Sequence, residues 1–342
     1  MKLRLVVMLT GVALLIFFAT DVWAKDNAMT KINGGGATFP FPIYSKWFDE
    51  YHKLHPNVQI NYQSIGSGGG IRQITEHTID FGATDSPMTD NQIAKVSGKI
   101  LHIPTVLGAV VPVYNLSGIK NLNLTGEVMA DMFMGRILKW NDLAIAKMNP
   151  GVSLPSDDIV VIHRADGSGT TFCFVDYLSK VSPNWNKNVG RGTSVKWPTG
   201  LGGKGNEGVA GLIRQMPNSI GYVELIYAEQ NQLSHAAVRN QSGKFVKGSV
   251  ASVTAAATSV GQNIPEDYRV SITNAMGEYA YPISTFTWLL VYQKNTENKG
   301  IILKAFLNWV LTEGEKMATK LGYAPLPKGV IEKVQKTIES IQ

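Results

Sequence analysis

Apolar residues along this chain follow two alternating periods, one typical of helices and one typical of strands. Between residues 43 and 54 they recur at helical spacing, and residues 58–62 then alternate apolar and polar as in a half-buried strand. Residues 106–114 and 286–292 are almost continuously apolar, which is typical of strands buried on both faces. This repeated succession of strand and helix predicts an α/β fold.

The same alternation continues to the C-terminus. A short apolar strand is expected over residues 159–162. Helical spacing recurs over residues 125–140, 171–180, 209–215, 301–311 and 330–341. We expect the two long apolar strands, 106–114 and 286–292, to carry the chain from one domain to the other and back, as a hinge of two strands.

The first residues have the pattern of a secretory signal peptide. A basic start precedes an apolar run over residues 6–18, and Val22 and Ala24 supply small side chains before a cleavage point. A membrane anchor is the alternative, but the run is too short for a hydrocarbon core about 30 Å thick. We therefore expect residues 1–24 to be removed near Ala24 and the remainder to reside in the periplasm, with a length that fits two domains.

Charge and composition exclude several classes of function. The net charge is +6, but no two Lys or Arg residues are adjacent, so the basic face that a nucleic-acid partner requires is not indicated. The six histidines show no metal-binding spacing, and we expect neither a metal nor a cofactor. The single cysteine, Cys173, lies in an apolar helical stretch and is interpreted as a buried thiol. No pattern indicates an obligate interface, and we expect a monomer.

Three glycine-rich loops, each with a hydroxyl residue, stand before predicted helices. They cover residues 34–40, 65–70 and 166–170. The first amides of a helix have no intrahelical partner and lie at the positive end of its dipole, so such termini bind phosphate and similar anions. Glycine allows close approach to the backbone, and Ser or Thr adds a neutral donor.

Each loop taken alone is weak evidence, because Ser or Thr before a helix is usually a cap and glycine is usually a turn. Three such loops in one chain, the last preceded by Arg164, favour an anion site, since a guanidinium grips oxyanions with a planar fork. The spacing in 66–70 differs from the dinucleotide fingerprint, and Lys204 lacks the sequence context of a nucleotide-phosphate loop.

These motifs resemble the periplasmic phosphate-binding proteins of bacterial high-affinity phosphate ABC transporters. The similarity runs essentially from Asn33 to the C-terminus. Its strongest stretches are residues 36–40, 65–67, 80–85, 164–170, 195–198 and 200–206. The resemblance implies a two-domain solute-binding fold, type II-like, with a ligand cleft between the domains. We expect residues 25–108 and 288–342 to form domain I and residues 109–287 to form domain II.

The resemblance also implies a function and a set of site residues. The protein is expected to bind inorganic phosphate and deliver it to the permease subunits of an inner-membrane ABC transporter, without enzymatic activity. Asp166 is expected to support the site by pairing with Arg164. The residues expected to bind phosphate are Thr38, Phe39, Ser67, Asp85, Arg164, Ser168, Gly169 and Thr170.

Asp85 is the residue expected to discriminate between anions. A carboxylate beside a dianion repels it unless the ligand carries a proton that it can donate. Phosphate has such a proton near neutral pH and sulfate does not, so sulfate would be disfavoured by several kcal/mol. The alternative is that Asp85 only caps the turn over residues 85–87. On the residues alone this interpretation carries at least equal weight, and the resemblance reverses that balance.

Three other functions are alternatives to phosphate transport. Residues 31–36 are also similar to the start of the so-called DING phosphate-binding proteins, some of which are linked to phosphatase activity, although no activated nucleophile or metal cluster is evident. A site for another oxyanion, such as sulfate or molybdate, is the second alternative, against which Asp85 argues. A surface adhesion role is the third.

Overall fold

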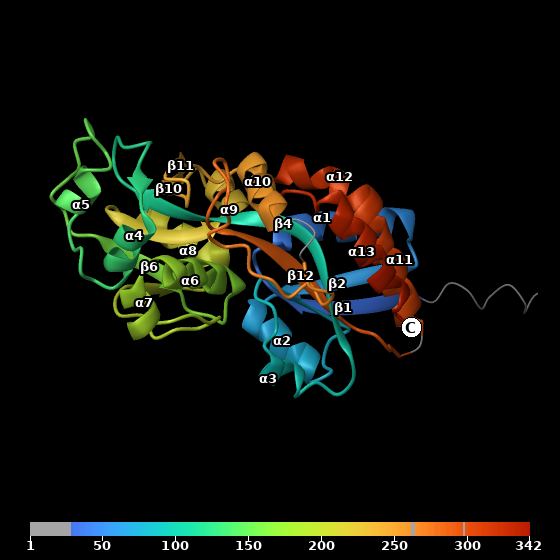
Figure 1. Ribbon diagram of the computed structural model, residues 1–342. Helices are drawn as coiled ribbons and strands as arrows, with labels where there is room; N and C mark the ends of the chain where they lie inside the picture. The colour runs from blue at the N-terminus through green and yellow to red at the C-terminus, as the bar shows by residue number, and fades with distance from the viewer. Residues whose placement is uncertain (1–28, 261–263, 297) are drawn as a thin grey trace, which may run out of the picture.

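The computed structural model describes residues 29–260, 264–296 and 298–342, and the predicted signal peptide with its cleavage point lies outside these ranges. Within the described residues, nine strands form one mixed sheet in the order β2-β1-β3-β12-β4-β8-β6-β7, with β9 beside β4. Helices cover both faces of this sheet along an elongated molecule (Figure 1). The strands are β1 (Thr30–Gly36), β2 (Val58–Ser64), β3 (Phe81–Thr84), β4 (Ile100–Asn115), β6 (Val160–Arg164), β7 (Leu201–Gly203), β8 (Ser219–Glu224), β9 (Ser234–His235) and β12 (Ser284–Tyr292).

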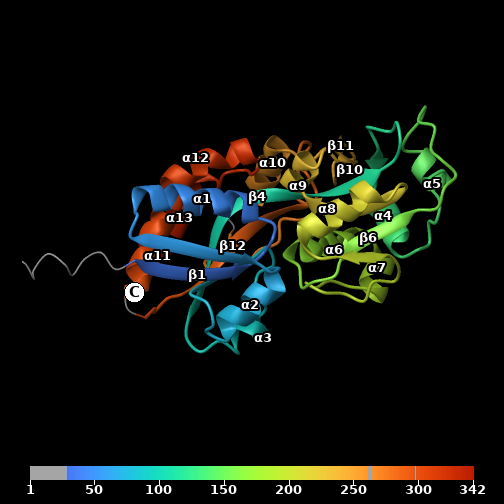
Figure 2. The ribbon, with the colours of Figure 1, turned by 180° about the vertical axis from the view of Figure 1, so that it is seen from behind.

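The elements fall into two lobes that lie at opposite ends of the sheet (Figures 1 and 2). The first lobe combines β1–β3 and β12 with the helices α1 (Phe41–Leu54), α2 (Ser67–Thr75), α3 (Asp90–Ile93), α11 (Lys299–Trp309), α12 (Glu315–Ala318) and α13 (Lys328–Glu339). A π-helical turn (Val310–Gly314) joins α11 to α12, and a 3-10 turn (Thr319–Leu321) follows α12.

The second lobe contains β6–β8 and the helices of the middle of the chain. These are α4 (Gly126–Phe133), α5 (Leu143–Ala146), α6 (Gly169–Val181), α7 (Pro183–Asn188), α8 (Gly205–Gln215) and α9 (Leu225–Gln230). A small separate sheet of β5 (Asn123–Leu124), β10 (Ala237–Arg239) and β11 (Phe245–Val246) lies at its outer part. The helix α10 (Val250–Val260) packs on β4 and β12.

The long strand β4 belongs to both lobes. Its residues up to Ala109 pair with β12, and from Val110 onward it pairs with β8. The chain returns beside it, since the amide of Val110 donates to the carbonyl of Ile283 just before β12 begins. All but the last residue of β4 are buried, which explains why this strand is almost continuously apolar in the sequence.

Most predicted elements are present, and their ends differ for local reasons. The helix expected over 125–140 ends as α4 at Phe133, because Gly135 adopts a left-handed conformation with φ of 67°. The helix expected from residue 209 begins four residues earlier, at Gly205. The strand expected over 159–162 extends as β6 to Arg164, which places this arginine at the carboxyl end of the strand.

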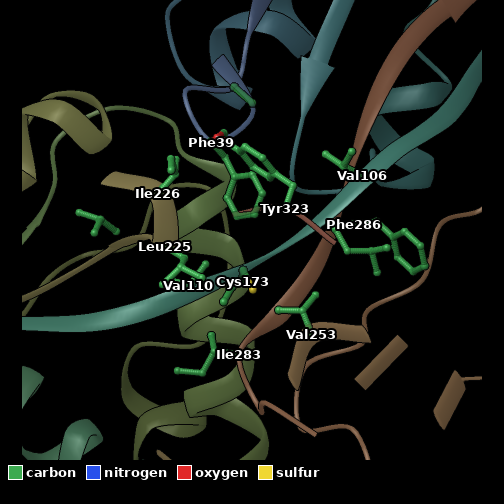
Figure 3. Close-up of a cluster of buried hydrophobic side chains, with 14 of the residues drawn as sticks. Phe39, Val106, Val110, Cys173, Leu225, Ile226, Val253, Ile283, Phe286 and Tyr323 are labelled. Carbon is green, nitrogen blue, oxygen red and sulfur yellow. Dashed lines mark hydrogen bonds between the residues drawn. The ribbon is translucent and has the colours of Figure 1, made fainter. Parts of the chain in front are cut away.

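A cluster of buried side chains fills the junction between the lobes (Figure 3). It includes Phe39, whose ring centroid lies 6.2 Å from that of Tyr323. Val110 and Ile283 contribute from the two crossing segments, and both are fully buried. The predicted burial of Cys173 is confirmed, and burial raises the pKa of its thiol well above the ordinary value, so the group stays a neutral packing element. No helix in the described ranges has the length and apolarity to cross a bilayer.

Candidate functional site

The three glycine-rich loops meet where the two lobes touch. The amide of Gly68, at the start of α2, donates a 2.8 Å hydrogen bond to the carbonyl of Gly167, which precedes α6. A Cβ atom placed on Gly169 would lie 2.5 Å from Ser67 Oγ and 2.7 Å from Asp85 Cβ. Because atoms in proteins do not approach so closely, only glycine at position 169 lets the lobes close to this distance.

Arg164, at the end of β6, is held by Asp166 in a two-pronged contact. Its Nε lies 2.8 Å from Asp166 Oδ1, and its Nη2 lies 2.6 Å from Asp166 Oδ2. Burial by itself would raise the pKa of Asp166, but the hydrogen bonds and charge of Arg164 lower it below the usual value. The remaining nitrogen, Nη1, donates to Thr170 Oγ1 at 3.3 Å. The fork therefore fixes the guanidinium with its Nη1 edge directed at Thr170, at the start of α6.

Asp85 follows β3 and is only 1% exposed. Its Oδ1 accepts a 2.9 Å hydrogen bond from Thr287 Oγ1 of β12. Its Oδ2 lies 3.4 Å from Ser67 Oγ, a long contact that leaves this oxygen able to accept a stronger bond. Burial raises the pKa of Asp85 to about 7, although the Thr287 hydroxyl, the charge of Arg164 and the Ser67 hydroxyl oppose the shift. A modest change in surroundings is enough to ionise or protonate this carboxyl group.

The loop before α1 places Thr38 and Phe39 against the second lobe. Both residues are buried, and the hydroxyl of Tyr227 in α9 donates to the carbonyl of Thr38 at 2.6 Å. The hydroxyl of Tyr323 donates to the carbonyl of Phe39 at 2.6 Å. The bond from Tyr227 fixes the peptide group that carries the Phe39 amide, so the direction in which the loop presents this amide is set by a tertiary contact.

Ser168 and Thr170 stand at the N-terminus of α6, a helix of 13 residues. Ser168 Oγ caps the helix by accepting from the amide of Thr171 at 3.0 Å. Its own proton is not needed for this bond and remains available to a ligand. The first amides of α6 have no intrahelical acceptor, and the helix dipole adds positive potential at the same point.

The fold therefore brings together the residues singled out in the sequence. Ser67, Asp85 and Gly169 lie in mutual contact across the lobes, and Arg164, Asp166 and Thr170 form one hydrogen-bonded group. Asp166 is partly exposed and the other eight are buried: Thr38, Phe39, Ser67, Asp85, Arg164, Ser168, Gly169 and Thr170.

Three residues at this junction were missed by the sequence reasoning. Asn206 contacts Thr38 across the lobes, Tyr227 fixes the Thr38 carbonyl, and Thr287 donates to Asp85. A signal existed for two of them, since Asn206 ends a glycine-rich loop and Thr287 is a polar residue in a buried strand. Tyr227 gave none, because an aromatic residue on an apolar helix is usually core.

The donor set suits an oxygen anion. Hydroxyls, helix-terminal amides and the Arg164 guanidinium converge from both lobes, with the carboxyl group of Asp85 among them and that of Asp166 paired with Arg164. Among the residues that the structure describes, no group of three or more His, Cys, Asp or Glu side chains is arranged to hold a metal ion. The arrangement can enclose an anion whose charge is met by dipoles and one fixed positive group.

Comparison with known proteins identifies the family. The model of the PBP superfamily domain matches residues 23–313. The phosphate-binding protein PstS of Pasteurella multocida (strain Pm70) is 47% identical, over 96% of this chain and 95% of its own length. The chain belongs to the phosphate-binding protein PstS family. PstS of Haemophilus influenzae is also 47% identical, over 92% of this chain and 93% of its own length.

A solved structure shows the same fold at much lower identity. The high-affinity periplasmic phosphate-binding protein PfluDING, solved with bound phosphate, is 21% identical and covers 90% of this chain and 93% of its own, with a TM-score of 0.74. The chain therefore has the two-domain α/β fold expected from its sequence.

Proposed function

We infer that the protein binds inorganic phosphate with high affinity and supplies it to an ABC transporter for uptake. Its PstS relatives are named as phosphate-binding proteins, and the family comprises substrate-binding proteins of transporters and not enzymes. The phosphatase alternative raised by residues 31–36 is therefore set aside. The ligand is phosphate itself, and the family implies no cofactor.

The observation that favours phosphate over other anions is the position of Asp85 among hydrogen-bond donors. Its Oδ2 is the carboxylate oxygen left without a short partner, while the hydroxyls and amides around it offer protons. A ligand that carries a proton donates a hydrogen bond to Oδ2 and accepts hydrogen bonds on its other oxygens. Phosphate at neutral pH fits, whereas sulfate would place a bare oxygen against a buried carboxylate.

We propose a role for each site residue on this basis. Thr38, Ser67, Ser168 and Thr170 donate through their hydroxyls, and the amides of Phe39, Gly169 and Thr170 add backbone donors. Arg164 supplies the positive charge, and Asp166 holds its guanidinium in place. Asp85 accepts the ligand proton. Support comes from the burial and mutual contacts of these groups at the junction.

Closure around the ligand is proposed to occur by hinge bending between residues 25–108 with 288–342 and residues 109–287. The change of partner of β4 between Ala109 and Val110 supports a hinge at this point. We further propose that the protein is exported, cleaved near Ala24 and monomeric in the periplasm. The closed form then docks on the permease subunits, where reopening releases phosphate.

Calorimetric titration of the mature protein at pH 8 with phosphate, sulfate and arsenate tests the proposal. Phosphate is expected to bind tightly, arsenate to bind because it also carries a proton, and sulfate to bind far more weakly. Asp85→Asn is the matched variant, expected to narrow the gap between phosphate and sulfate. Equal affinity of the unmodified protein for phosphate and sulfate at this pH would contradict the proposal and favour a general oxyanion binder.

A further inference from the structure

Asn206 is a buried amide that joins hydroxyl groups from the two lobes. It is the second residue of α8 and is fully buried. Its Nδ2 lies 2.8 Å from Thr38 Oγ1 in the first lobe and 3.2 Å from Thr170 Oγ1 in the second. Both hydroxyls belong to the proposed phosphate site, so a single side chain spans the closed cleft.

The orientation of this amide is fixed by a backbone group. The amide nitrogen of Glu224 lies 3.0 Å from Asn206 Oδ1. A backbone N–H can only donate, so the atom that faces it must be the amide oxygen. The NH₂ group of Asn206 therefore faces the two threonines, and toward them it acts only as a donor.

Both threonine oxygens are already fully occupied as acceptors. Thr38 Oγ1 receives Asn206 Nδ2 and, at 3.3 Å, the backbone amide of Asn206. Thr170 Oγ1 receives Asn206 Nδ2 and, at 3.3 Å, Arg164 Nη1. A hydroxyl oxygen has two lone pairs and one proton, so each threonine has only its proton left to offer.

We propose that Asn206 is a positioning residue that makes Thr38 and Thr170 obligatory donors to bound phosphate and latches the two lobes in the closed state. This inference rests on the proposed phosphate site. Asn206 acts through the two hydroxyls, and the ligand accepts hydrogen bonds from them. Because neither hydroxyl can accept, a proton on the ligand hydrogen-bonds to Asp85. The site therefore discriminates more strongly between anions that carry a proton and anions that do not.

The proposed contact between the lobes predicts an effect on the rate of phosphate dissociation. The contact between Asn206 and Thr38 exists only when the lobes meet, so its loss acts on reopening and hence on the dissociation rate. Two hydrogen bonds to site hydroxyls are removed by Asn206→Ala, and each is typically worth about a factor of 2 to 12. We expect phosphate affinity to fall roughly 10- to 100-fold, mostly through faster dissociation.

A double-mutant cycle with Thr38→Val separates this role from a structural one. Affinity for phosphate is measured in the unmodified protein, in Asn206→Ala, in Thr38→Val and in the double variant. The fold-loss of phosphate affinity caused by Asn206→Ala is expected to be at least about threefold smaller in the Thr38→Val background than in the unmodified protein. The same fold-loss in both backgrounds would overturn the proposal. Failure of the unmodified protein to bind phosphate would instead overturn the proposed function.

Two further variants separate loss of the Asn206 donor from a general loss of folding stability. Asn206→Asp keeps the oxygen that accepts from Glu224 and preserves side-chain shape, and it replaces the NH₂ donor by an acceptor that captures the threonine protons. It is expected to bind phosphate at least as weakly as Asn206→Ala while staying folded, and near-normal binding by this variant would contradict the proposal. Asn240→Ala removes a buried amide that bonds backbone carbonyls over residues 277–280, and is expected to lower unfolding stability without changing phosphate dissociation.

Discussion

Thr287 Oγ1 donates a 2.9 Å hydrogen bond to Asp85 Oδ1, which ties the acid of the site to the strand that returns from the second lobe. The bond occupies one carboxylate oxygen and leaves the other, Oδ2, toward the opposing lobe. Because a donor stabilises the charged form, Thr287 also restrains the rise in pKa that burial imposes on Asp85. This one contact therefore sets the direction of Asp85 Oδ2 and favours the ionised form of the carboxyl group, which can accept a hydrogen bond.

Removing the Thr287 hydroxyl is expected to weaken phosphate binding. In Thr287→Val the carboxylate of Asp85 loses its donor, its pKa rises further and less of it is ionised to accept the ligand proton. Phosphate affinity at pH 7.5 should fall roughly tenfold by calorimetry. Thr285→Val on the same strand is the control, since the Thr285 hydroxyl bonds the carbonyl of Phe286. An equal loss in both variants would point to general damage to β12.

Sulfate binding should depend on pH through Asp85. Sulfate has no proton to give, so it needs the protonated carboxyl group, which prevails below the pKa of about 7. Above that pH the protonated fraction falls tenfold per unit, and the dissociation constant for sulfate should rise by about the same factor between pH 7.5 and 8.5. Titrations over this range provide the measurement. Asp85→Asn should remove the slope, and a slope that persists in this variant would assign the titration to another group.

The closed state depends on backbone contact between Gly68 and Gly167. A Cβ on Gly68 would lie 3.1 Å from the Cα of Gly167, closer than most real contacts, so Gly68→Ala holds the lobes a few tenths of an ångström apart. Phosphate dissociation should accelerate roughly tenfold, with little change in the stability of the ligand-free protein. Gly211→Ala in α8 is the control because nothing lies within 4 Å of the added methyl group. Unchanged dissociation in Gly68→Ala would mean that the lobes tolerate the gap.

His102 should make the protein less stable in acid. It is buried in β4, and its Nε2 accepts a 3.2 Å bond from the amide of Met88, in the segment that follows Asp85. Burial, aided by the charge of Arg269 and opposed by Asp267, lowers the pKa of His102 from 6.5 to about 4. The unfolded chain therefore binds more protons between these values, and stability falls by roughly 1.4 kcal/mol per pH unit as pH drops from 6.5 to 4.

Denaturant unfolding at pH 7.5, 5.5 and 4.5 checks this expectation, with ~1 kcal/mol as the difference to resolve. His102→Gln keeps an acceptor near the position of Nε2 but cannot take up a proton, so its stability should vary less with pH than that of the unmodified protein. His55→Gln removes an exposed imidazole and serves as the control. Identical acid profiles for His102→Gln and the unmodified protein would rule out His102 as the source.

The sequence alone determined the kind of fold and the kind of site. Apolar periodicity predicted the strands and helices, and glycine with Ser or Thr before three helices indicated anion binding, since these features depend on residues close together in the chain. The resemblance to the family predicted nine site residues, and the fold brings these residues to one junction. The end of α4 was predicted wrongly, because a single left-handed glycine decides it.

Tertiary structure alone decided the partners that tune those residues. Asp85 and Thr287 are 202 positions apart, and Asn206 and Thr38 are 168 apart, so no local pattern could pair them. The pKa of Asp85 likewise follows from burial between two lobes, which depends on how the strands β4 and β12 bring the halves of the chain together. Chemistry that resides in one residue type can be predicted from sequence, whereas its strength depends on neighbours that only the folded chain supplies.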